Sequence, residues 1–233
     1  IGQIKGSIPQ LETIFFSSSN YSTKNQRSSV GNITELSSVL RKHFLALPVA
    51  KALNLQEGHF SPHSELGKCS ECSGKGVITI EMTYLEDIEL VCETCQGKKI
   101  KPLYADISSG EFTYFEATQM PLASLLPKLE LTPKFKRISQ LLSSLKIDYL
   151  SLERNAAELS GGERQRLALL SHLKRPIQNS VLIFENLSFG LSPLEKKALG
   201  QTLEEINAAF NTILIIDNDK CWKSIAHHEI DFH

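Results

Sequence analysis

Two pairs of cysteines constrain the fold of this chain more than any other feature of its sequence. The pairs are separated by residues 73–91 and consist of Cys69 with Cys72 and of Cys92 with Cys95. Two residues lie inside each pair, and this spacing lets one tight turn offer two thiolates to the same ion. Disulfides, or two separate redox pairs, are the alternative interpretations. We predict that the four sulfurs converge in a closed, tetrahedral Zn²⁺ site with a structural role.

Composition sets broader limits on the class of protein. The chain has 233 residues, 41% of them hydrophobic and 22% charged, which is ordinary for a globular protein. Its formal net charge of −1 predicts no bulk attraction to nucleic acid, so any such contact must come from local patches. We find no signal peptide and no apolar run long enough to span a bilayer, and we expect a cytoplasmic protein with no membrane partner. The chain opens at Ile1 without an initiator methionine, so we interpret it as part of a longer protein.

The segment between the cysteine pairs is rich in β-branched residues with rough alternation. Residues 77–84 and 87–91 therefore predict a two-stranded hairpin. Four lysines, Lys75, Lys98, Lys99 and Lys101, cluster on the same module, and the first three are the candidates for binding DNA. They either contact the phosphates of nucleic acid or form a solvated charged surface, and the sequence leaves both interpretations open. The fifth cysteine, Cys221, stands alone and is expected to be a small buried hydrophobe.

A serine and two glycines stand directly before residues 163–174, whose apolar residues recur at helical spacing. Glycines let a backbone approach a ligand closely, and a helix N-terminus presents free N–H groups with a positive dipole end. Together they favour phosphate binding by four residues: Ser160, Gly161, Gly162 and Glu163. An ordinary serine-capped helix is the alternative interpretation of the Ser-Gly-Gly run alone.

Outside these features, the amino-terminal half predicts a strand at 11–16, a long polar loop through Asn32 and a helix at 34–47 that Pro48 interrupts. Residues 103–120 are expected to form short strands and turns.

The carboxy-terminal half predicts helices separated by buried strands. A helix starts at Thr132-Pro133 and runs to Lys146, and a capping box at Ser192 and Glu195 opens another that runs to about Phe210. Residues 181–184 and 212–216 have the fully apolar pattern of buried parallel strands. Helix and strand alternating at these lengths imply an α/β fold with helical crossovers.

The run LSGGERQR at 159–166 resembles the signature motif of the ABC ATPases, which closes over the γ-phosphate of ATP held by a partner cassette. A four-cysteine module ahead of that motif resembles the carboxy-terminal half of the UvrA family, the damage-sensing ATPases of bacterial nucleotide excision repair. The resemblance covers CSECSGKGVITIEMTYLEDIELVCETCQGKK (69–99), LSLERNAAELSGGERQR (150–166) and VLIFENLSFGLSP (181–193).

The resemblance implies an ABC-ATPase-type α/β core with a helical signature subdomain and a zinc module. Part of the core and a connecting helix are expected at 1–48, the zinc insertion at 49–120, the signature subdomain at 121–176 and the Walker B side of the core at 177–233. The implied cofactors are Zn²⁺ and ATP with Mg²⁺. The implied partners are double-stranded DNA with lesions, a second ABC half or dimer partner, and a UvrB-like subunit of the excision complex.

The chain departs from the family at the residues that would carry hydrolysis. Glu185 and Asn186 stand where Walker B has aspartate and glutamate, and the neutral amide of Asn186 cannot act as a general base. Asn218 replaces the histidine expected after the last strand, and Ser19 aligns with the Q-loop glutamine. No GxxxxGK[ST] phosphate loop occurs in the sequence. We therefore predict that this half does not hydrolyse ATP at its own site but contributes its signature in trans.

Three other functions compete with this interpretation. An inactive ABC-type scaffold or dimerisation module would explain Asn186 but not the complete signature. A DnaJ-type chaperone domain has four CxxCxGxG repeats, whereas only residues 69–76 have that full form here. A transporter ATPase would explain the signature but not the cysteine module.

Overall fold

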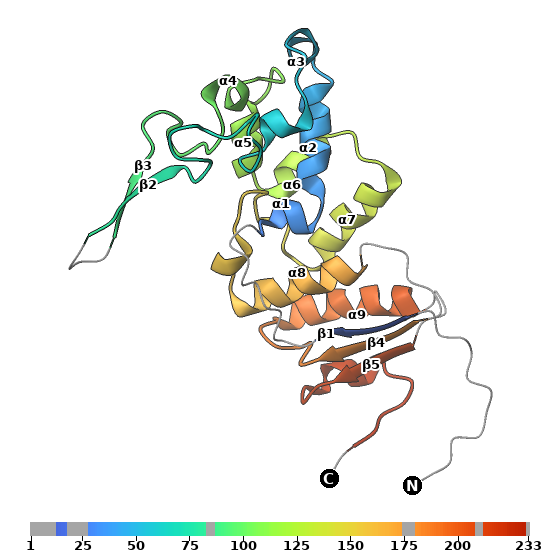
Figure 1. The fold of residues 1–233 in the computed structure, drawn as a ribbon. Coiled ribbons are helices and arrows are strands. Elements are labelled where there is room, and N and C mark those ends of the chain that lie inside the picture. The colour runs from blue at the N-terminus through green and yellow to red at the C-terminus, as the bar shows by residue number, and fades with distance from the viewer. Residues whose placement is uncertain (1–12, 18–27, 83–86, 174–179, 208–211, 232–233) are drawn as a thin grey trace. The chain divides into compact units, whose positions relative to one another are not determined.

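The computed structural model of the chain describes residues 13–17, 28–82, 87–173, 180–207 and 212–231. The chain forms two compact units (Figure 1). The first, which we call the sheet unit, comprises residues 1–34, 131–150 and 154–233. The second, the cysteine unit, comprises residues 35–130 and 151–153.

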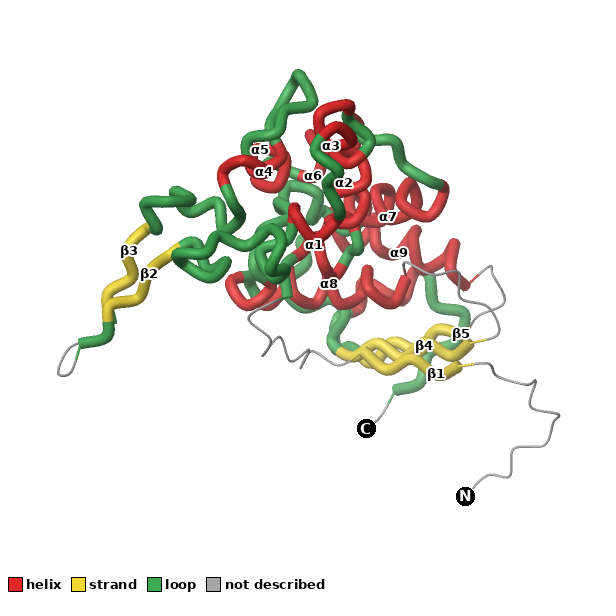
Figure 2. Tube along the Cα trace, turned by 45° about the horizontal axis from the view of Figure 1, so that its top comes forward, coloured by secondary structure: helices red, strands yellow, loops and turns green. Residues whose placement is uncertain are grey.

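The sheet unit is built on three parallel strands, as the alternation of helices and strands predicted. The strands are β1 (Thr13–Ser17), β4 (Ser180–Glu185) and β5 (Thr212–Ile216), in the order β1-β4-β5. Figures 1 and 2 show them side by side, with the long helices of the unit on one face. Parallel pairing brings the carboxyl ends of β4 and β5 to the same edge, with Glu185 opposite Ile216. This edge carries the residues after β4 that the sequence singled out.

The prediction that β5 is buried is wrong. On β4, Leu182 and Phe184 are buried, but on β5 Leu214 is 48% exposed and Ile216 is 56% exposed. These two residues belong to the strand at one end of the sheet order. They alternate with half-buried residues along β5 and pair with the half-buried Ile183 and Glu185 of β4, so they lie on the face of the sheet opposite the long helices. An apolar run alone does not tell whether both faces of a strand are covered.

Three helices of the sheet unit confirm the predicted segments. They are α7 (Pro133–Ser144), α8 (Gly161–Leu173) and α9 (Pro193–Asn207). The capping box of α9 forms as expected: the Ser192 N–H donates to Glu195 Oε2 at 2.7 Å and the Glu195 N–H donates to Ser192 Oγ at 3.4 Å. Thr132 precedes α7 as predicted, but its side chain makes no capping hydrogen bond. The predicted ends at Lys174 and Phe210, like Ser19, lie outside the described residues.

The predicted loop through Asn32 and helix at 34–47 are both partly wrong. A short helix, α1 (Val30–Ile33), forms inside the expected loop, because Ser29 Oγ caps it by accepting from the Asn32 N–H at 3.3 Å. Glu35 then adopts a left-handed conformation with φ 65°, and α2 (Leu36–Leu45) starts only after it. Pro48 opens a further helix, α3 (Pro48–Ala52), because proline fits a first helical turn.

The cysteine unit has an aromatic core. Phe44, Phe60, Phe112 and Tyr114 are buried against one another, with the Phe60 and Tyr114 rings 4.6 Å apart between centroids. The Tyr114 hydroxyl donates to the Phe60 carbonyl at 2.8 Å, so this buried polar group is satisfied.

The predicted strands and turns at 103–120 are partly wrong: short helices cover half of these residues, and an isolated bridge joins Ser108 and Thr113 between them. The helices are α4 (Pro102–Ala105) and α5 (Tyr114–Gln119), and α6 (Leu122–Leu125) follows. A capping box between Thr113 and Glu116 starts α5, a signal that the sequence contained and that periodicity over so short a segment did not show. Single-turn 3₁₀ segments at Glu57–Phe60 and Leu126–Lys128 complete the unit.

The predicted hairpin is confirmed, with shorter strands. β2 (Val77–Ile80) pairs antiparallel with β3 (Ile88–Val91), and residues 83–86 lie outside the described residues. In Figures 1 and 2 the hairpin projects from the helices of its own unit. Its apolar side chains are accordingly exposed, Val91 by 64%.

Candidate functional site

The structure brings the four predicted cysteines together. Their sulfur atoms all lie within 4.8 Å of one another, and all four residues are buried. Cys69 Sγ lies 3.9 Å from Cys92 Sγ, and Cys72 Sγ lies 3.6 Å from Cys95 Sγ. These are the separations of thiolates around one ion, about 3.8 Å for Zn–S bonds of about 2.3 Å, and all four cysteines are free rather than disulfide-bonded. The cluster is therefore compatible with a four-cysteine Zn²⁺ site.

The loops around the cysteines are also suited to hold a metal ion. The Gly76 N–H donates to Cys72 Sγ at 3.2 Å, as a thiolate ligand requires. Gly74 has φ 82°, and a Cβ there would lie 2.1 Å from the Pro62 carbonyl oxygen, so only glycine fits this turn. A backbone hydrogen bond from Cys95 lowers the pKa of the Cys92 thiol to about 7, whereas burial raises the pKa of the Cys95 thiol to about 12.

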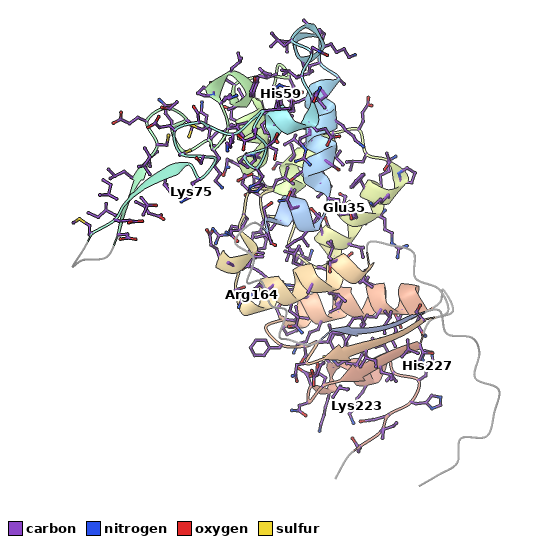
Figure 3. All side chains as sticks on the ribbon, in the orientation of Figure 1. Glu35, His59, Lys75, Arg164, Lys223 and His227 are labelled. Carbon is purple, nitrogen blue, oxygen red and sulfur yellow. The ribbon has the colours of Figure 1, made fainter. Side chains whose placement is uncertain are left out.

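The three lysines predicted to contact phosphate have different surroundings. Lys98 Nζ lies 2.6 Å from Asp106 Oδ1, and Lys99 Nζ lies 2.8 Å from Glu153 Oε2. Both charges are therefore paired within the cysteine unit. Lys75 is exposed beside β2 and has no ion-pair partner among the described residues (Figure 3).

The signature stretch lies at the first turn of α8, with Arg164 on that turn (Figure 3). The Ser160 N–H donates to Glu163 Oε2 at 2.6 Å and the Glu163 N–H donates to Ser160 Oγ at 3.3 Å, a capping box. The N–H groups of Gly161 and Gly162 have no acceptor within the described part of the chain. Burial works to raise the pKa of Glu163, but hydrogen bonds from Tyr149 and Ser160 outweigh it and lower that pKa.

Two side chains support this turn: that of Tyr149, which the sequence analysis did not single out, and that of Arg166, which ends the run at 159–166. The Tyr149 hydroxyl donates to Glu163 Oε1. Arg166, nearly buried, pairs with Glu195 of α9 and donates through Nη1 to the Leu145 carbonyl at 3.4 Å. Spacing along the chain gives no signal for such contacts, because they join residues that are far apart in the sequence.

The residues after β4 lie against the same helix start. Asn186 adopts a left-handed conformation with φ 52°; its N–H donates to the Ile216 carbonyl at 2.8 Å and its carbonyl accepts from Gln165 Nε2 at 2.7 Å. Gly162 packs against Gly190, and a Cβ on Gly162 would lie 3.4 Å from the Gly190 carbonyl oxygen. The structure thus brings Asn186 to the signature turn.

Glu185 ends β4, half-buried, and Asn218 is exposed just beyond β5. Asp217, directly before Asn218, is a further residue at this edge of the sheet that the sequence analysis did not single out. It accepts from the Ser188 N–H and Oγ, each at 2.7 Å, and from Trp222 Nε1 at 3.0 Å. Burial works to raise the pKa of Asp217, but these hydrogen bonds outweigh it and lower that pKa. Asp217 therefore ties the loop after β4 to the end of β5.

Cys221 is half-buried rather than buried, so that prediction is only partly right. Its N–H donates to Asp219 Oδ1 at 2.8 Å, and burial raises the pKa of its thiol to about 11. It lies in the 3₁₀ segment Lys220–Ser224, far along the chain from the cysteine cluster.

We expect the conformation of Asn186 to restrict what can replace it. Asn186→Gly should leave the free energy of unfolding nearly unchanged, whereas Asn186→Val should lower it by roughly 1–2 kcal/mol, since a β-branched residue fits the left-handed region poorly. Chemical denaturation of both variants measures the difference. Equal stability of the two would show that this backbone conformation is not required.

Comparison with known proteins places these features in context. No protein-family model matches the chain. UvrABC system protein A of Staphylococcus epidermidis is 31% identical over 230 residues, covering 98% of this chain and 24% of that protein. The same protein of Bradyrhizobium diazoefficiens is 29% identical over 197 residues, covering 84% of this chain and 20% of that protein. This similarity indicates homology to part of UvrABC system protein A.

A solved structure agrees on the fold. UvrA2 from Deinococcus radiodurans superposes with a TM-score of 0.81 at 23% identity, covering 96% of this chain and 28% of that one. The chain thus has the mixed α/β fold of part of UvrA2. It spans only 20% to 24% of the length of the curated relatives named here.

Across the described parts of the chain, no helix combines the length and the apolarity needed to cross a bilayer.

Proposed function

We propose that this chain supplies the signature side of a UvrA-like ABC ATPase that recognises damaged DNA in nucleotide excision repair in the cytoplasm. In this proposal the first turn of α8 binds the terminal phosphate of an ATP, with its Mg²⁺, that a facing cassette carries. That cassette is a second ABC half or a dimer partner. A UvrB-like subunit is the proposed partner in the excision complex.

The open glycines at the start of α8 are the observation that carries the proposal. The N–H groups of Gly161 and Gly162 point from a helix N-terminus and have no acceptor among the described residues. Such groups bind phosphate oxygens through hydrogen bonds and the helix dipole. The capping box between Ser160 and Glu163 fixes the turn without using them.

The loop after β4 supports the proposal that this chain does not hydrolyse ATP at a site of its own. The backbone of Asn186 is held on both sides, by Ile216 and by Gln165, and its side chain is a neutral amide. An amide cannot take a proton from an attacking water, so the general base of the reaction would be missing. Glu185 retains a carboxylate that could hold Mg²⁺ through water.

The cysteine cluster supports a bound, structural Zn²⁺. Four sulfurs occupy all the ligand positions of a tetrahedral ion, leaving no open position for catalysis. We also propose that the same module binds DNA through Lys75, since Lys98 and Lys99 are paired and Lys75 has no ion-pair partner in the described region.

ATP turnover by the full-length protein in its native assembly tests the proposal. Gly162→Asp should abolish turnover, because a carboxylate beside the open N–H groups repels phosphate. Lys197→Ala, on the exposed part of α9, is the matched control and should leave turnover unchanged. Normal turnover in Gly162→Asp would rule out a signature role. Normal turnover after loss of the facing cassette's phosphate-loop lysine would instead show that hydrolysis occurs at this chain's own site.

An inactive scaffold or dimerisation module is the second candidate, and Asn186 is the observation that favours it. A scaffold would assemble equally well with and without ATP. Sedimentation of the native assembly with and without ATP therefore separates the two functions.

A further inference from the structure

Tyr149 lies outside the signature stretch, and its side chain contacts Glu163 within that stretch. It lies in the turn after α7, where 54% of its surface is exposed, yet its hydroxyl donates to Glu163 Oε1. Its neighbours Ile147 and Leu150 are buried, so the backbone on both sides of the ring is held in place. The hydroxyl at the end of this half-exposed ring is thus held by a directed hydrogen bond to Glu163.

The same turn is tied to α8 a second time, independently of the phenol. Arg166 of α8 donates to the carbonyl of Leu145, which is itself buried. Arg166 also pairs with Glu195, so its own position is fixed. Loss of the phenol hydroxyl alone therefore leaves the turn and the helix in register.

The hydrogen bond from Tyr149 helps to fix the position of the Glu163 carboxylate. One carboxylate oxygen accepts from the Ser160 N–H at 2.6 Å and the other accepts from Tyr149. Both oxygens therefore accept from donors other than the N–H groups of Gly161 and Gly162. A carboxylate free to move would be attracted to those same N–H groups, since a helix N-terminus favours any anion.

We propose that Tyr149 is a positioning residue of the signature site. By holding the Glu163 carboxylate on Ser160, it keeps the two glycine N–H groups open to the terminal phosphate of ATP on a facing cassette. This inference rests on the proposed function. Tyr149 itself need not touch the nucleotide, because it acts through the charge that it restrains.

The titration behaviour of the pair is consistent with a permanent restraint. Burial and the hydrogen bond to Glu163 raise the pKa of Tyr149 to about 12, so the phenol stays protonated and able to donate at neutral pH. The pKa of Glu163 is lowered, so its carboxylate stays charged. The effect of losing the phenol should therefore be the same throughout the neutral pH range.

Steady-state ATP turnover by the full-length protein in its native assembly is the test. A hydrogen bond to a charged group is worth enough that Tyr149→Phe should raise the KM for ATP about tenfold, with kcat and the thermal unfolding midpoint nearly unchanged. In a Glu163→Gln background, which keeps an acceptor for the Ser160 N–H but carries no charge, Tyr149→Phe should raise KM about twofold or less.

The outcomes distinguish a failure of the Tyr149 proposal from a failure of the proposed signature function. An unchanged KM in Tyr149→Phe, with turnover abolished in Gly162→Asp, overturns the role of Tyr149 and leaves the signature function standing. A tenfold effect in both backgrounds overturns the charge mechanism, since the amide would then behave like the carboxylate. Full turnover in Gly162→Asp overturns the signature function, and the role of Tyr149 falls with it.

Discussion

Replacing Cys92 and Cys95 together by serine is expected to abolish zinc binding and unfold the loops of residues 67–101. The four cysteines form a buried cluster of their own, and the hairpin beside them exposes its apolar side chains. Apart from the cluster, the module is held by backbone hydrogen bonds and by the ion pairs of Lys98 and Lys99, which contribute far less than a bound metal ion. Binding of a structural zinc ion stabilises small modules by about 10–16 kcal/mol, so its loss should exceed any other single effect on this part of the chain.

Zinc released by a thiol reagent measures the effect: one equivalent per chain is expected from the unaltered protein and none from the double variant. Hydrogen exchange of residues 67–101 should speed up in parallel. Cys221→Ser is the matched control, because Cys221 lies outside the cluster, and it should keep the full equivalent. A double variant that retains zinc would contradict the four-cysteine site. Equal binding of lesion-containing DNA by both proteins would separate the module from DNA recognition.

Arg166→Ala is expected to lower the free energy of unfolding of the sheet unit by about 3–5 kcal/mol. Arg166 and Glu195 pair with side-chain exposures of only 10% and 20%, so removal of the arginine leaves a mostly buried carboxylate without its cation. The variant also loses the hydrogen bonds that Arg166 donates to the carbonyls of Gly162 and Leu145. Urea denaturation followed by circular dichroism measures the change.

Two further variants show whether the buried charge is the cause. Arg154→Ala breaks the ion pair with Glu158, whose side chains are 48% and 59% exposed, and should cost no more than about 1 kcal/mol. Arg166→Met combined with Glu195→Gln keeps an acceptor for the Ser192 N–H and leaves no unpaired charge, so it should recover part of the loss. A change below about 1 kcal/mol in Arg166→Ala would mean that the pair contributes no more than a surface one.

Local signals along the chain predicted many features of this protein correctly. The cysteine spacing predicted the cluster, since two residues between paired ligands suffice to form each turn. The box at Ser192 and Glu195 predicted the start of α9, because capping joins residues only three positions apart. The apolar runs at β4 and β5 predicted parallel strands, because helical crossovers between them leave few other topologies.

The tertiary structure decided whatever depends on contacts between distant parts of the chain. Leu214 is exposed because it lies on the face of the sheet opposite the long helices, and α2 starts late because Glu35 adopts a left-handed backbone conformation that the sequence pattern does not predict. The donors that surround Glu163 and Asp217 come from residues up to 29 positions away. Sequence alone therefore determined the long helices, the strands and the ligand types, because their signals are local, whereas it missed the short helices of the cysteine unit. Folding determined which side chains fix the signature turn, because hydrogen bonds form wherever the packed elements bring donor and acceptor together.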